Sequence, residues 1–155
     1  MTRISIENLI QLLAMIGIIG SLIFVGLEMR QSQKIAIAGQ QMERTAITTN
    51  GIVVHTEVGL DWTSVARNFP ELADQYPPGL AAVRNYYQQA LYVFENDYIQ
   101  YSQGLMTDGV WQAKLTYFVS LYDQCSNRDI MQRRKLFFSQ CLVELIDSLP
   151  DNCAD

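Results

Sequence analysis

The stretch LIQLLAMIGIIGSLIFVGLEMR, from Leu9 to Arg30, decides the fold class of this chain. Twenty residues without a charge lie between Glu7 and Glu28, and a helix of that length extends about 30 Å, the thickness of the hydrocarbon core of a bilayer. Twelve of the residues from Leu9 to Leu27 are Leu, Ile, Val or Phe, and each favours insertion by roughly 0.3–0.6 kcal/mol near mid-membrane. The sequence therefore predicts one N-terminal transmembrane helix.

An apolar helix without a polar stripe needs lipid or protein on every side. The alternative reading is a soluble helical enzyme or ligand-binding protein in which Leu9–Leu27 is the buried core helix. In that case the rest of a 155-residue chain has to cover this helix completely while burying its own apolar faces. We therefore expect a transmembrane anchor over residues 1–30 and a helical cytoplasmic domain over residues 31–155.

The orientation follows from the basic residues on the two sides of the apolar stretch. Arg3 precedes it, whereas Arg30, Lys34 and Arg44 follow it. Because loops rich in Lys and Arg stay in the cytoplasm, this count predicts a cytoplasmic body. No Trp or Tyr marks either end of the span.

Small side chains form one narrow face of the predicted span. Ala14, Gly17 and Ser21 fall at positions i, i+3 and i+7. Such faces let helices approach closely in lipid, so they predict self-association or docking to another membrane protein. The plainer explanation is that small residues are common in membrane helices. A channel built from this helix would need Gln11 or Glu28 to face a lumen, and nothing in the sequence requires that.

The remaining residues predict an all-α body of about five helices. The first helix continues past the membrane until the turn signal Asn50-Gly51. Further helices are expected from Pro70, over Ala81–Gln103, from Thr107 to Tyr122, and from a capping box at Ser126 to Leu149 with a break near Phe138-Ser139.

The charges and cysteines exclude several classes of function. The formal net charge is -5, and all of the excess acid follows Lys34. An acidic body predicts no nucleic-acid partner, because phosphate binding requires a basic face. Cys125, Cys141 and Cys153 are odd in number and follow no CxxC or Cys/His spacing. They are expected to be reduced thiols, not a disulfide framework or a zinc site.

Few side chains are candidates for chemistry. His55 is the single histidine, so a histidine triad or a multi-histidine metal site is excluded. A buried polar site is expected at Glu95, Asn96 and Tyr98, where Glu95 borders an apolar stripe and tyrosines are near enough to bond it. A structural polar cluster is the plainer interpretation. No catalytic residue, cofactor or metal site is predicted, and nothing indicates an enzyme.

The stretch ALYVFENDYIQYSQGLMTDGVW, from Ala90 to Trp111, together with LEMRQSQ and NFPELA, resembles an uncharacterised group of small bacterial proteins. In that group an N-terminal hydrophobic helix leads into a helical body with a YEN-x-x-x-Q-Y-x-x-G-x-x-x-x-x-x-W pattern. The positions that match here, with Phe94 in place of the Tyr, are Glu95, Asn96, Gln100, Tyr101, Gly104 and Trp111. The resemblance implies a bacterial inner membrane and no known activity.

These observations together predict a single-pass membrane protein that acts by association. Its expected partners are the lipid bilayer and either copies of itself or another membrane protein.

Overall fold

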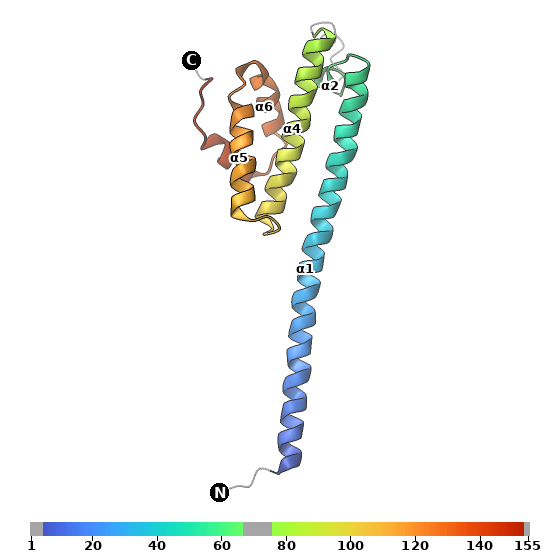
Figure 1. The fold of residues 1–155 in the computed structure, drawn as a ribbon, viewed down its shortest axis with the longest axis vertical. Helices are drawn as coiled ribbons and strands as arrows, with labels where there is room; N and C mark the ends of the chain where they lie inside the picture. The colour runs from blue at the N-terminus through green and yellow to red at the C-terminus, as the bar shows by residue number, and fades with distance from the viewer. Residues whose placement is uncertain (1–4, 67–75, 154–155) are drawn as a thin grey trace. The chain divides into compact units, whose positions relative to one another are not determined.

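The computed structural model describes residues 5–66 and 76–153 (Figure 1). Within these ranges the chain is all-α, as predicted, and no strand occurs in them. The helices are α1 (Ile6–Glu57), α2 (Trp62–Ala66), α4 (Pro78–Ser102), α5 (Asp108–Tyr122), the 3-10 turn η1 (Cys125–Asn127), α6 (Arg128–Lys135) and α7 (Gln140–Asp147). The helix expected from Pro70 lies outside the described residues.

The chain divides into two compact units, Met1–Ile37 and Ala38–Asp155. In the described part of the first unit, the apolar half of α1 is a single helix whose large apolar side chains are exposed. Its most apolar window is 0% buried, and side chains such as Leu22 are 66% exposed. By length and composition this helix is able to cross a membrane.

The second unit begins with the end of α1, which is longer than expected. The turn signal Asn50-Gly51 does not stop it, because Ile52 is fully buried and packing outweighs the local preference for a turn. The helix ends instead at Glu57, two residues before Gly59, whose φ of 74° is in the left-handed region that favours glycine. Leu60 N donates to the His55 carbonyl at 2.9 Å, which completes the C-terminal cap.

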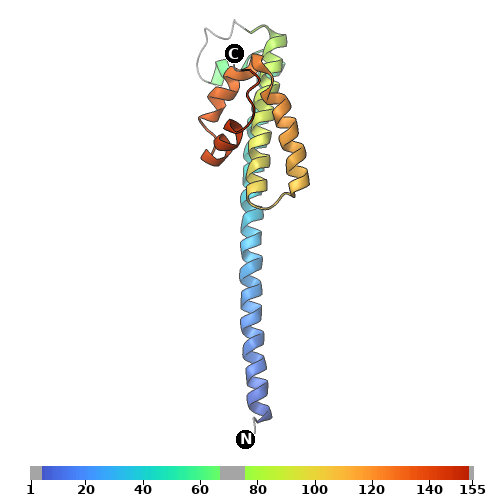
Figure 2. The same cartoon turned by 90° about the vertical axis from the view of Figure 1, so that its left-hand side faces the viewer.

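The core of the second unit lies where α4, α5, α6 and α7 meet. Figure 2 shows α5 on one side of α4 and the last helices on the other. Phe94 on α4 stacks on Phe118 of α5 with ring centroids 3.7 Å apart, and Trp111 stacks on Phe94 and Tyr101. The aromatic side chains of α4 and α5 therefore face each other.

A buried ion network connects α4 with the segments before and after it. Arg84 on α4 donates to Asp61 at 3.2 Å and, through both terminal nitrogens, to Asp129 of α6 at 3.1 and 2.8 Å. Asp61 is fully buried, and its other oxygen caps α2 by accepting hydrogen bonds from the backbone and hydroxyl of Ser64. One guanidinium therefore fixes α2, α4 and α6 together.

Asn85, the next residue on α4, fixes the connection from α1 to α2. Its amide nitrogen donates to the Thr56 hydroxyl and to the Leu60 carbonyl, and its oxygen accepts from the backbone N–H of Trp62 at 2.7 Å. Two of these three hydrogen bonds satisfy backbone groups of the turn, the Leu60 carbonyl and the Trp62 N–H.

The cysteine prediction is wrong. Cys125 and Cys153 form a disulfide with Cα atoms 5.4 Å apart, and Cys141 is the free, exposed cysteine of the described residues. The pairing spans 28 residues, so only the fold that returns the C-terminal segment to η1 brings the thiols together. Arg128 holds the same segment by an ion pair with Asp151 at 2.8 Å.

The last two helices confirm one expectation and correct another. A break separates α6 from α7 at Leu136–Ser139, near the expected position. The capping box at Ser126 does not form: α6 begins at Arg128, after η1, and has no side-chain cap.

Removal of the Arg84 guanidinium should destabilise the protein strongly. Arg84→Met leaves the buried Asp61 carboxylate without its cation, and breaking such a pair costs roughly 3–5 kcal/mol of unfolding free energy. Lys114→Met, which breaks the half-exposed Lys114–Asp97 pair, should cost less than about 1 kcal/mol. Urea unfolding followed by tryptophan fluorescence measures the unfolding free energy of both variants. Equal losses in the two variants would contradict the role of Arg84 as the main stabilising ion pair.

Candidate functional site

Two cavities in the second unit share a wall made of Tyr92 and Arg134. The first has a volume of about 260 Å³ and the second about 180 Å³. Their shared wall is the guanidinium of Arg134, which stacks on the Tyr92 ring at 3.7 Å from its centroid.

The second cavity, which we call the Asn96 cavity, lies between two helix faces with the same spacing. Each face contributes residues at i, i+3, i+4 and i+7, which place four side chains on one side of a helix. The lining residues are Gln41, Arg44, Thr45 and Thr48 from α1, Tyr92, Glu95, Asn96 and Ile99 from α4, and Arg134 from α6.

Arg134 reaches the Asn96 cavity from α6 and forms an ion pair with Glu95. Its Nε is buried and has no hydrogen-bond partner among the residues that the structure describes. A planar guanidinium that stacks on one side and pairs at its end is held in a fixed orientation. Arg134 is therefore a rigid wall of the site, with one donor unused.

Glu95 is a carboxyl group under opposing influences. Burial raises its pKa, while the charge of Arg134 and the hydrogen bond from it lower the pKa. Burial prevails, so the pKa of Glu95 lies above its ordinary value. The cavity thus contains a carboxyl group that takes up a proton more readily than an exposed one.

Asn96 contributes the strongest polar anomaly of the site. Its side chain is 7% exposed, and its Oδ1 has no hydrogen-bond partner among the described residues. A buried carbonyl oxygen without a donor costs about 1–3 kcal/mol, so such groups are rare unless a ligand or water supplies the donor.

Arg44 is the free cation of the Asn96 cavity. Its exposed side chain forms no hydrogen bond or ion pair with any residue in the described ranges; only its backbone carbonyl is used, by the Thr48 hydroxyl at 3.0 Å. Arg134 and Glu95 neutralise each other, so Arg44 gives the lining its net positive charge.

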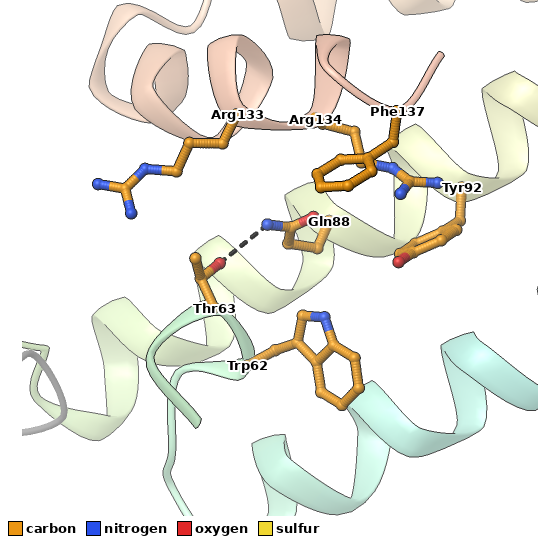
Figure 3. Close-up of a pocket in the computed structure, with 7 residues that line it drawn as sticks. All are labelled: Trp62, Thr63, Gln88, Tyr92, Arg133, Arg134 and Phe137. Carbon is orange, nitrogen blue, oxygen red and sulfur yellow. Dashed lines mark hydrogen bonds between the residues drawn. The ribbon is translucent and has the colours of Figure 1, made fainter. Parts of the chain in front are cut away.

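The first cavity is shown in Figure 3 and is more aromatic. Phe137 and Trp62 lie on opposite sides of it, and Gln88 donates to the Thr63 hydroxyl at 2.9 Å across its floor. Arg133 points away from Arg134 at the rim. Its lining includes an exposed loop residue, Phe137, so the cavity is open on that side.

The structure brings together two of the three residues of the predicted polar site. Glu95 and Asn96 line the same cavity, whereas Tyr98 lies against Trp111 with ring centroids 5.9 Å apart. Tyr98 is two residues after Asn96, which turns its side chain to another side of the helix. Burial raises the pKa of Tyr98, and Cys141 adds to the rise.

Arg44 and Arg134 were not predicted as members of a site. Arg134 belongs to the basic run Arg133-Arg134-Lys135, in which Arg134 pairs with Glu95 and Lys135 pairs with Asp147. The sequence feature that could have indicated this site is the spacing of the polar residues Gln41 to Thr48 on α1, which matches the spacing of the lining residues on α4. This spacing indicates a site only if α1 and α4 lie next to each other, and the sequence alone does not show that they do.

His55 and the other potential metal-binding side chains form no metal-binding cluster in the described residues. His55 Nδ1 is 2.8 Å from the Gly51 carbonyl, and its ring meets Trp62 edge-on, as expected for a structural histidine. No group of three metal-binding side chains occurs in residues 5–66 and 76–153.

The small face of the first unit stays a prediction. In that helix the Ser21 hydroxyl donates to the Ile18 carbonyl at 2.8 Å, and a Cβ added at Gly17 would meet nothing within 4 Å. The face with Ala14, Gly17 and Ser21 is therefore open along the chain's own helix.

The pH dependence of stability should reveal the raised pKa of Glu95. The native state keeps this proton to a higher pH than the unfolded chain does, so its contribution to stability falls as the pH rises above 4.5, the ordinary value. Glu95→Gln lacks this step. The unfolding free energy of the wild type minus that of Glu95→Gln should therefore decrease with pH in urea titrations.

A difference that grows with pH would mean that pairing with Arg134 outweighs burial, and would contradict the pKa direction.

A comparison of the chain with models of protein families, with curated proteins and with solved structures finds no match. The resemblance to the group with the YEN pattern therefore stays a prediction. The functional argument rests on the uncovered apolar helix and on the two cavities.

Proposed function

We propose that this chain is a single-pass protein of a bacterial inner membrane that acts by association, as a homo-oligomer or as an accessory subunit of a membrane complex. The observation that carries the proposal is the apolar stretch Leu9–Leu27, which no described residue covers. Apolar side chains around the whole circumference of a helix need lipid or other protein on every side.

The polar groups of the stretch are compatible with lipid. A helix satisfies its own backbone hydrogen bonds, and the Ser21 hydroxyl is satisfied by the Ile18 carbonyl. The open face at Gly17 supports association, because close packing of small residues is a main source of helix–helix affinity in lipid.

The disulfide changes the proposed orientation. Disulfides persist in oxidising compartments and are rare in the cytoplasm. The Cys125–Cys153 bond therefore favours a body outside the cytoplasm, whereas the basic residues favour a body inside it. The charge argument depends on a difference of very few residues, so we propose the periplasmic orientation.

The soluble alternative makes Leu9–Leu27 a core helix, which would need protein on every side. Carbonate extraction separates the two. The protein should stay in the membrane pellet, and release into the supernatant would overturn the anchor.

Self-association through the small face should be sensitive to bulk at Gly17. Gly17→Leu should reduce the mass of the detergent-solubilised assembly, because a large side chain prevents close approach of a second helix. Gly26→Leu is the matched control: it also meets nothing within 4 Å, and it lies roughly 150° round the helix from the face. Equal behaviour of the two variants would contradict the face.

The orientation is tested with the one thiol that the disulfide leaves free. Cys141 is exposed on α7, so a membrane-impermeant maleimide should label it in spheroplasts before lysis if the body is periplasmic. Cys141→Ser should abolish the label. Labelling that appears only after lysis would place the body in the cytoplasm.

A further inference from the structure

The Asn96 cavity contains unused hydrogen-bonding groups of both kinds. The buried Oδ1 of Asn96 lacks a donor, the buried Nε of Arg134 lacks an acceptor, and the guanidinium of Arg44 is free within the described residues. In a folded domain most buried polar groups are satisfied. An unused acceptor beside unused cationic donors therefore indicates a missing molecule that carries both an anionic group and a donor.

The charge of the lining residues indicates which anionic group the bound molecule carries. Glu95 and Arg134 pair with each other, so one uncompensated positive charge, that of Arg44, remains at the cavity. Guanidinium groups bind carboxylates through paired, charge-assisted hydrogen bonds. A carboxylate group supplies the single negative charge that pairs with Arg44.

The position of Asn96 indicates which hydrogen-bond donor the bound molecule carries. Its Oδ1 accepts a hydrogen bond from a hydroxyl or an ammonium group, and the Glu95 carboxyl on the same helix face accepts from the same kinds of group. The volume of about 180 Å³ is below the usual range for drug-sized ligands and suits a molecule of few atoms.

From these contacts we infer that the Asn96 cavity binds a small carboxylic acid with a hydroxyl or amino group next to the carboxylate. Arg44 holds the carboxylate, and Asn96 accepts the hydrogen bond from the neighbouring donor. The site lies wholly within the second unit, so it does not rest on insertion of α1 into a membrane.

The probes are L-lactate, L-alanine and propionate, titrated into the purified full-length chain by calorimetry. L-lactate or L-alanine should bind, and whichever binds more tightly distinguishes a hydroxyl from an amino donor. Propionate lacks the donor, and it should bind about tenfold more weakly because Asn96 Oδ1 stays unpaired. Propionate that binds equally well would overturn the role of Asn96, and absence of binding by all three would overturn the site.

Two arginine variants locate the binding. Arg44→Gln should weaken binding by about tenfold or more, since it removes the charge-assisted bonds. Arg133→Gln is the matched control, because Arg133 is also a cation without an ion pair among the described residues but lines only the other cavity. Loss of binding in Arg133→Gln with none in Arg44→Gln would overturn the placement.

Asn96→Leu should remove the preference for L-lactate or L-alanine over propionate. Should this buried variant fail to fold, the exposed Arg44 variant and the propionate comparison still decide the proposal.

Discussion

A guanidinium buried among carboxylates is the constraint on which the body of this protein depends. Arg84 is almost completely enclosed, and a charge in that position is tolerated only when it is fully paired. Its partners, Asp61 and Asp129, lie on segments that flank α4 in the sequence on both sides. Satisfying one charge therefore fixes where α2 and α6 begin, and with them the side chains that line both cavities.

The helices of the body were predictable because their signals are local. The aromatic stripe of α4, the stop at Gly104 and the break between α6 and α7 are all written in neighbouring residues. The predictions that were wrong concern features that depend on contacts between residues far apart in the sequence. α1 passes Asn50-Gly51 because buried packing holds it, and the disulfide forms because the fold returns Cys153 to Cys125.

The residues of the candidate site also divide into those that local sequence could predict and those that depend on distant contacts. Glu95 and Asn96 were identifiable from one helix, since an acid and an amide beside an apolar stripe are unusual there. Arg44 and Arg134 lie 52 and 38 residues from Asn96 along the chain. They belong to the site because α1 and α6 pack against α4. Tyr98 was misplaced because sequence proximity is not the same as a shared helix face.

The wall that α1 supplies to the Asn96 cavity has a practical consequence for dissecting the protein. One helix carries both the apolar stretch and the residues Gln41 to Thr48, so the boundary between the two units lies inside a secondary-structure element. A truncation that removes all of α1 would remove four of the nine residues that line the cavity. A soluble fragment has to begin at or before Ala38, where the second unit starts, and its first turns will need a new cap.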